Sequence, residues 1–122
     1  LTTAEFLEAV RRAVRASGVV IGNVWSSPSN RLYDSMVRTY RETFDALVVL
    51  RMQGAGNRIL LALPRARPSD RAELARLARA LPLAQRLDFD LGELVERGYM
   101  PYGDEPAGGR VLRDADLKAG AN

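Results

Sequence analysis

The chain has 122 residues, 47% of them hydrophobic, which suffices for one packed domain, and no apolar run reaches the roughly 18–20 residues of a membrane span. Its net charge is +3 with both signs interspersed, so the continuous basic stripe that would bind nucleic acid is not expected. Histidine and cysteine are absent, which excludes disulfides, thiolate or imidazole metal sites and a Ser-His-Asp triad.

The first predicted element is a helix over residues 3–16. Thr2 and Glu5 have the spacing of a capping box, in which a hydroxyl side chain precedes a glutamate by three residues. Gly18 lies where a left-handed C-terminal cap is expected. Apolar residues recur at helical spacing and predict one buried stripe: Phe6, Leu7, Val10, Ala13 and Val14. The outer face carries arginines, for which a solvated surface is favoured over a phosphate patch: Arg11, Arg12 and Arg15.

A β-strand is predicted over residues 19–25, because this segment is short, β-branched and apolar on both faces. That pattern indicates a strand buried under helices on both sides. A loop rich in capping residues follows, and then a second helix over residues 31–44. The spacing of its stripe favours core packing over an aromatic cofactor box: Tyr33, Met36, Val37, Tyr40 and Phe44.

Two more strands are predicted over residues 47–51 and 59–63. The glycine-rich turn between them, residues 53–57, is too short for a crossover helix, so the strands should form an antiparallel hairpin. The return strand is the most uniformly apolar segment of the chain, which indicates a central position in the sheet. Gly54 and Gly56 resemble part of a nucleotide-binding loop, but no helix follows them, and the hairpin interpretation is favoured.

Helices and a tail are expected after the hairpin. Ser69 or Asp70 should cap a third helix, which Pro82 ends or kinks. Asp90 should cap a short fourth helix that Gly98 closes. Capping explains Asp90 better than a catalytic pairing with a neighbouring carboxylate does.

From Tyr99 onward proline and glycine dominate. Val111 and Leu112 are the apolar pair expected to dock before the end of the chain frays. We therefore expect residues 1–98 to form the folded part and residues 99–122 a C-terminal tail.

The order of these elements predicts an α/β fold. The first strand–helix–strand unit should give parallel strands, and the hairpin adds one antiparallel strand to them. We expect the C-terminal half of a Rossmann-like, methyltransferase-type sheet, mixed by its terminal antiparallel hairpin and with helices on both faces. No Gly-x-Gly-x-x-Gly motif occurs, so we expect no cofactor to bind in this chain. The nucleotide-binding front half should lie upstream of Leu1.

Three segments taken in order resemble the spermidine synthase-like proteins of bacteria, in the polyamine aminopropyltransferase family. They are residues 1–7 (LTTAEFL), residues 18–25 (GVVIGNVW) and residues 56–60 (GNRIL). A looser likeness covers residues 88–91 and 110–114. The resemblance implies a role in bacterial polyamine biosynthesis in the cytoplasm.

The family has a methyltransferase-like Rossmann fold. Its members transfer an aminopropyl group from decarboxylated S-adenosylmethionine to an amine such as putrescine. Its glycine-rich loop and its catalytic aspartate precede the part that this chain resembles. The resemblance therefore implies no catalytic, cofactor or metal residue here, and a fragment that is inactive alone.

The resemblance does imply one wall of an amine pocket, formed by Asn23, Trp25 and Asn57. Asn23 can bind a substrate amine or satisfy the backbone of the loop. A partly buried packing role is favoured for Trp25, and a turn conformation for Asn57. The short hairpin turn departs from the longer, aromatic-containing loop of characterised spermidine synthases, which argues against putrescine as the acceptor.

Three functional hypotheses remain at this point. The chain is part of an aminopropyltransferase-like enzyme, part of an S-adenosylmethionine-dependent methyltransferase-like or degenerate relative, or an interaction module in its own right. The interaction module would be a monomeric, cooperatively folding chain that engages a partner through its own surface. In a truncated domain, residues 19–25 would form an apolar edge of the sheet. We expect this edge to pair with the missing N-terminal half or with a second copy of the chain, and we expect neither nucleic acid nor a membrane as a partner.

Overall fold

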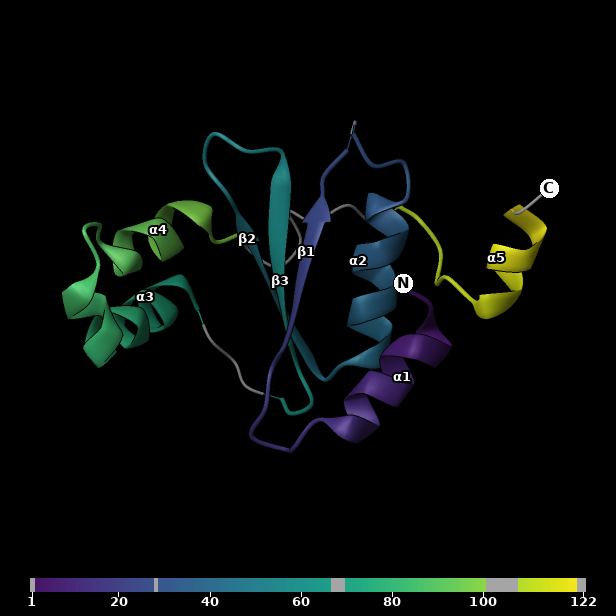
Figure 1. Ribbon diagram of the computed structural model, residues 1–122, viewed down its shortest axis with the longest axis horizontal. Coiled ribbons are helices and arrows are strands. Elements are labelled where there is room, and N and C mark those ends of the chain that lie inside the picture. The colour runs from purple at the N-terminus through teal and green to yellow at the C-terminus, as the bar shows by residue number, and fades with distance from the viewer. Residues whose placement is uncertain (1, 28, 67–69, 101–107, 121–122) are drawn as a thin grey trace.

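A computed structural model describes residues 2–27, 29–66, 70–100 and 108–120 of the chain. A three-stranded sheet stands at its centre, with helices on either side of it (Figure 1). The elements in chain order are α1 (Ala4–Ala13), β1 (Val20–Trp25), α2 (Tyr33–Thr43), β2 (Ala46–Arg51), β3 (Asn57–Leu63), α3 (Arg71–Ala80), the 3₁₀ helix η1 (Pro82–Arg86), α4 (Leu91–Gly98) and α5 (Asp114–Gly120).

The last strand in sequence is the central strand in space. β3 lies between β1 and β2 and runs antiparallel to both, so β1 and β2 point in the same direction. Trp25 faces Asn57 at one end of the first pairing, and Arg51 faces Arg58 at the same end of the second. The predicted hairpin and the central position of residues 59–63 are confirmed.

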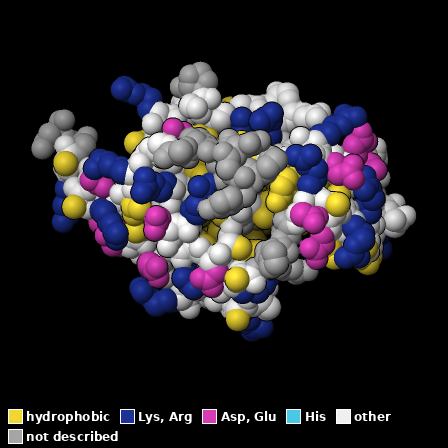
Figure 2. Space-filling view, turned by 180° about the vertical axis from the view of Figure 1, so that it is seen from behind, with side chains coloured by type: hydrophobic (Ala, Val, Ile, Leu, Met, Phe, Trp, Pro, Cys, Tyr) yellow, Lys and Arg dark blue, Asp and Glu magenta, His cyan; other side chains and the backbone are white. Residues whose placement is uncertain are grey.

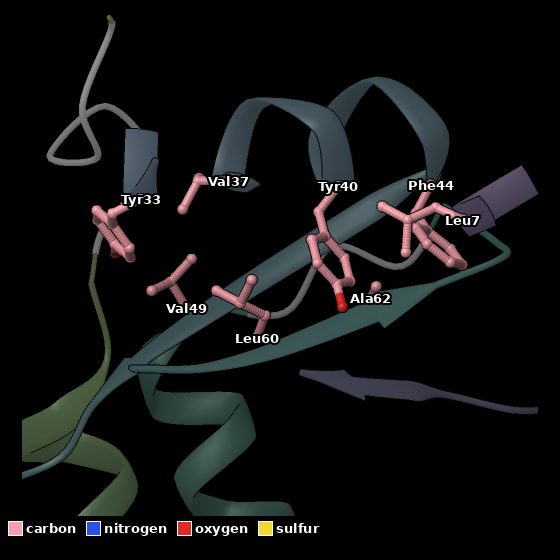
Figure 3. Close-up of a cluster of buried hydrophobic side chains, with 8 residues drawn as sticks. All are labelled: Leu7, Tyr33, Val37, Tyr40, Phe44, Val49, Leu60 and Ala62. Carbon is pink, nitrogen blue, oxygen red and sulfur yellow. The ribbon is translucent and has the colours of Figure 1, made fainter. Parts of the chain in front are cut away.

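The main core lies between α1 and α2 and one face of the sheet. The buried side chains of this cluster are drawn in Figure 3: Leu7, Tyr33, Val37, Tyr40, Phe44, Val49, Leu60 and Ala62. The stripe predicted on α2 provides half of them. The Tyr40 ring lies against β1 at Gly22, where a Cβ atom would come within 2.8 Å of the tyrosine hydroxyl. Because Gly22 has no side chain, β1 leaves room for the Tyr40 ring at this position.

The opposite face of the sheet is covered mainly over β2, and α3 also borders Leu61 and Leu63 of β3. The helices α3 and α4 pack on each other, and α4 contacts β2, where Val48 and Leu50 are buried. Ile21 and Trp25 of β1 are 64% and 61% exposed on this face. The prediction that residues 19–25 are buried on both sides is therefore wrong, because α3 and α4 do not cover Ile21 and Trp25.

The structure of α1 departs from its prediction in three details. Thr3, not Thr2, caps the helix by accepting a 3.3 Å hydrogen bond from the Phe6 backbone N–H. The helix ends at Ala13, and Gly18 is not left-handed. Phe6 is 40% exposed, because the buried face of α1 centres on Leu7.

The outer arginines of α1 are not all solvated. Arg11 donates 2.8 Å and 2.9 Å hydrogen bonds to the Thr43 carbonyl and to the Asp45 carboxylate. This arginine therefore connects α1 to the connection between α2 and β2.

The caps of the later helices follow the sequence signals. Asp70 and Asp90 accept hydrogen bonds of 2.8 Å and 3.1 Å from the backbone N–H groups three residues later. α3 ends at Ala80, and Pro82 opens the 3₁₀ helix. Ser69, the alternative cap, lies outside the described residues, as does the proline- and glycine-rich stretch 101–107.

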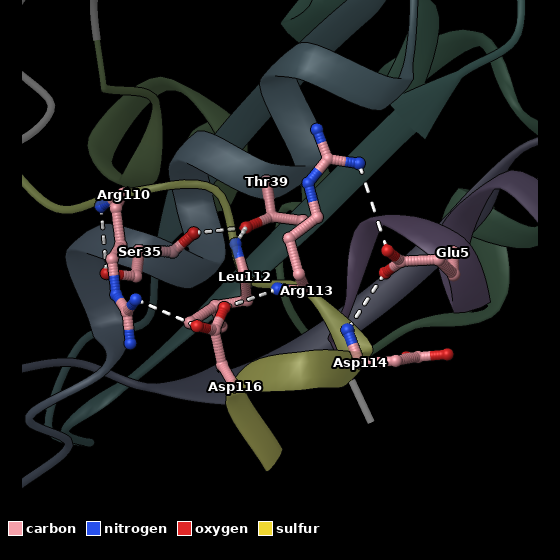
Figure 4. A network of polar contacts seen from close by, with 8 residues as sticks. All are labelled: Glu5, Ser35, Thr39, Arg110, Leu112, Arg113, Asp114 and Asp116. Carbon is pink, nitrogen blue, oxygen red and sulfur yellow. Dashed lines mark hydrogen bonds and ion pairs between the residues drawn. The ribbon is translucent and has the colours of Figure 1, made fainter. Parts of the chain in front are cut away.

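The segment before α5 docks against α1 and α2. Leu112 is buried, and its carbonyl accepts a 2.8 Å hydrogen bond from the Ala4 backbone N–H. Its own N–H donates a 2.9 Å hydrogen bond to the Thr39 hydroxyl, which in turn donates to the Ser35 carbonyl (Figure 4). The predicted docking of Leu112 is thus confirmed.

The helix α5 was not expected in the tail. Asp116 accepts a 2.7 Å hydrogen bond from the Arg113 backbone N–H, which is half of a capping box, and also pairs with Arg110. Glu5 of α1 accepts a hydrogen bond from the Asp114 backbone N–H (Figure 4). Hydrogen bonds to these carboxylates stabilise the start of α5, a short helix that buries little apolar surface.

Replacing Thr39 by valine tests the docking of this segment. Thr39→Val keeps the shape but leaves the Leu112 N–H buried without an acceptor, so the free energy of unfolding in urea should fall by about 1–3 kcal/mol. Thr43→Val is the matched control, because the Thr43 hydroxyl only donates to the Thr39 carbonyl, and it should cost below about 1 kcal/mol. Equal losses in the two variants would contradict the docking role of Thr39.

Candidate functional site

Asn23, Trp25 and Asn57 come together at one end of the sheet. Asn57 Nδ2 donates a 2.8 Å hydrogen bond to Asn23 Oδ1, and Trp25 is the register partner of Asn57. All three lie on the face that α3 and α4 leave open over β1, because residues two apart on a strand share a face and register partners do too. We call this group the amide–tryptophan patch.

Asn57 is the first residue of β3 and not part of a turn, so the predicted turn conformation is wrong. Gly54, with a φ of 71°, takes the left-handed position of the hairpin instead. The side-chain Oδ1 of Asn57 is buried and accepts no hydrogen bond within the described part of the chain. The patch therefore contains a hydrogen-bond acceptor without a donor.

Trp25 is mostly exposed, so the predicted packing role is wrong as well. Its ring borders the hairpin turn, since a Cβ atom on Gly56 would lie 3.3 Å from it. The backbone around it is held firmly. Asn30 Nδ2 donates a 3.0 Å hydrogen bond to the Trp25 carbonyl, and the Ser26 hydroxyl donates one of 2.6 Å to the Gly56 carbonyl.

A second polar group lies at the same end of the sheet on the opposite face, and the sequence reasoning missed it. Tyr33 is 4% exposed, yet within the described residues its hydroxyl has no hydrogen-bond partner, and neither has the buried Nε of Arg58. Burial raises the pKa of Tyr33 above its usual value. Arg58 lowers this pKa through its charge and through its side-chain N–H beside the tyrosine oxygen, while the charge of Asp34 raises it and that of Arg51 lowers it. We call Tyr33, Arg51 and Arg58 the tyrosine–arginine cluster.

The sequence held one signal for this cluster. Arg51 and Arg58 stand at the ends of two apolar strands on either side of the hairpin, so pairing of the strands places the two arginines opposite each other. That Tyr33 lies beneath them depends on how α2 crosses the sheet. Strand and helix periodicity does not give this crossing.

A cavity of about 240 Å³ lies between the hairpin turn and α4. It is lined by Arg51, Met52, Gln53, Phe89, Asp90, Glu93, Leu94 and Arg97. Its carboxylates already have partners: Asp90 caps α4 and pairs with Arg79, and Glu93 pairs with Arg97. The backbone hydrogen bond from Glu93 lowers the pKa of Asp90, which is the wrong direction for a general acid near neutral pH.

The described residues offer neither a carboxylate metal site nor a membrane-spanning helix. They contain no group of three or more carboxylates close enough to share a metal ion. Nor do they include a helix with the length and apolar character needed to cross a membrane. The space-filling view shows arginines and carboxylates interspersed over one side of the molecule, in keeping with the mixed charge of the sequence (Figure 2).

Comparison with known proteins adds one similarity. A curated polyamine aminopropyltransferase of Vibrio vulnificus is 34% identical over 85 residues, which are 69% of this chain and 27% of that protein. This chain is similar to part of that transferase. The matched residues of this chain span about a quarter of the length of that transferase. No family model matches the chain, and no solved structure matches it.

The raised pKa of Tyr33 has a consequence for stability. A folded-state pKa above the unfolded value of about 10 means that the protonated hydroxyl stabilises the fold below that pH. This contribution is lost as the pH rises through the folded pKa. We expect the free energy of unfolding to fall above about pH 10 and to fall less steeply in Tyr33→Phe. Identical pH profiles for the two proteins, measured by urea unfolding from pH 8 to 11, would contradict the assignment.

Proposed function

We propose that this chain belongs to a spermidine synthase-like aminopropyltransferase and forms the C-terminal half of its methyltransferase-type Rossmann sheet. In this proposal the amide–tryptophan patch is one wall of the pocket for the acceptor amine. The similarity to the Vibrio vulnificus aminopropyltransferase supports it, as does the resemblance of residues 1–7, 18–25 and 56–60 to the same family.

The topology is compatible with this assignment. β1 and β2 run in the same direction with β3 inserted antiparallel between them, and α2 connects the outer two strands. In doubly wound sheets, ligands bind beyond the carboxyl ends of the parallel strands. Trp25 ends β1 and lies at this edge, next to Asn57.

The observation that carries the proposal is the unpaired Oδ1 of Asn57. An ammonium or amine N–H is the donor that such a buried carbonyl oxygen lacks. The exposed indole of Trp25 beside it offers the flat, electron-rich face that attracts cations. The hydrogen bond from Asn57 Nδ2 to Asn23 fixes the direction of the amide, so Oδ1 keeps one orientation and is the atom that lacks a donor.

The chemistry of transfer is assigned to residues outside this chain. Decarboxylated S-adenosylmethionine, or S-adenosylmethionine in a methyltransferase-like relative, supplies an electrophilic carbon next to a sulfonium. The residues described here contribute the orientation of the attacking amine and no nucleotide-binding loop. On this proposal the chain alone is inactive.

The test is an assay of the complete gene product with decarboxylated S-adenosylmethionine and a panel of amines. We expect aminopropyl transfer, and in Asn57→Leu a rise in the KM for the amine of about tenfold or more, because a hydrogen bond to a charged group contributes about 1.5–3 kcal/mol. Gln53→Leu, in the neighbouring hairpin turn, is the control and should leave KM unchanged. Methyl transfer from S-adenosylmethionine, or no transfer at all, would overturn the proposal.

We also propose that the outer edge of β1 pairs with a strand from outside this chain. β1 is the outer strand of the described sheet, and residues 19–25 contain neither a charge nor a proline. Charges and prolines are the usual devices that keep a sheet edge from pairing. In the complete gene product the neighbour would come from the front half of the same domain, and for the chain alone it would be a second copy.

The chain alone should therefore self-associate, as measured by analytical ultracentrifugation. Ile21→Lys adds a charge to the exposed face of β1 and should raise the dissociation constant by about tenfold or more, equivalent to 1.4 kcal/mol. Leu117→Lys, on the exposed surface of α5, is the matched control and should have no effect. A chain that stays monomeric at high concentration would contradict the pairing of this edge.

A further inference from the structure

The two arginines of the tyrosine–arginine cluster form no ion pair with a described carboxylate. Arg51 and Arg58 are register partners across β2 and β3, so their side chains leave the sheet on the same face. Like charges placed directly opposite each other in a sheet are unfavourable.

Two buried donors of this cluster lack a well-aligned acceptor, although the side chain of Arg58 lies close enough to the Tyr33 oxygen to lower the tyrosine pKa. The hydroxyl of Tyr33 and the Nε of Arg58 are both buried, and neither has a partner in the described structure. Arg58 uses another nitrogen to donate a 3.2 Å hydrogen bond to the Asn57 carbonyl. Buried donors are normally paired, so these two imply an acceptor from outside the described residues.

The start of α2 adds to the same field. Tyr33 is the first residue of this eleven-residue helix, and the preceding Leu32 provides no side-chain cap. Asn30 already accepts hydrogen bonds from the N–H groups of Leu32 and Tyr33, so it is the helix dipole that makes this end favourable for negative charge. Asp34 in the first turn supplies one negative charge, whereas Arg51 and Arg58 together supply two positive charges.

We propose that the tyrosine–arginine cluster binds an oxyanion, namely the carboxylate or the phosphate group of a small molecule. Arg58 Nε and the Tyr33 hydroxyl donate hydrogen bonds to its oxygens, and Arg51 provides a second positive charge. The site is separate from the amide–tryptophan patch, because Asn57 and Arg58 are adjacent strand residues and point to opposite faces.

The direct test is an NMR titration of the ¹⁵N-labelled chain in which the Nε–H signals of the arginines are followed. Inorganic phosphate and acetate are added separately at constant ionic strength, with chloride as the third arm. We expect the Arg58 signal to move saturably with phosphate, with acetate or with both, and not with chloride. The two oxyanion arms distinguish a phosphate-bearing ligand from a carboxylate.

Three variants refine the result. Tyr33→Phe removes only the hydroxyl and should weaken the affinity about three- to tenfold. Arg58→Gln should abolish saturable binding, followed in this variant through the backbone amides of residues 33 and 34. Arg76→Gln removes the same charge from the exposed surface of α3 and should change nothing.

The proposal is overturned if the Arg58 signal responds to phosphate and acetate only as it does to chloride. It is equally overturned if Arg76→Gln weakens the response as much as Arg58→Gln does, since that would indicate general screening of charge. Neither outcome depends on amine binding at Asn57, so the two proposals stand or fall separately.

Discussion

Every backbone pairing in the described sheet passes through β3. β1 and β2 do not touch each other, and each forms its ladder only with the strand inserted between them. The core follows from this arrangement, because Leu60 and Ala62 in the middle of β3 are fully buried beneath α2. The hairpin turn that returns the chain into this slot is therefore the element on which both the core and the candidate site depend.

The two sites lie at one end of β3 but face opposite ways. Asn57 contributes to the open face and Arg58 to the face beneath α2, since consecutive strand residues alternate. One face thus offers an acceptor beside an exposed indole, and the other offers donors beside two guanidinium groups. A short stretch of one strand separates two regions of opposite chemical preference.

Local patterns predicted the elements well because each is recorded in neighbouring residues. The apolar stripe of α2, the caps Asp70 and Asp90, and the apolar run of β3 all correspond to observed features. The resemblance of short motifs to a known family also predicted that Asn23 and Asn57 lie in the same pocket wall, and the two side chains are hydrogen-bonded to each other. The sequence did not predict the exposure of Trp25 and Ile21 or the helix α5. These features depend on the positions of helices and carboxylates that are distant in the sequence.

The contact between α1 and the segment before α5 links the two ends of the described chain. The Asp114 backbone N–H reaches Glu5 across a separation of 109 residues. Such a contact closes a long loop, and loop closure must occur before the contact can stabilise anything. During synthesis α1 leaves the ribosome before Leu112 and Asp114 do, so the contact can form only after the residues between them have been made. A contact that joins the two ends of the described residues therefore depends on the local elements between them being in place first.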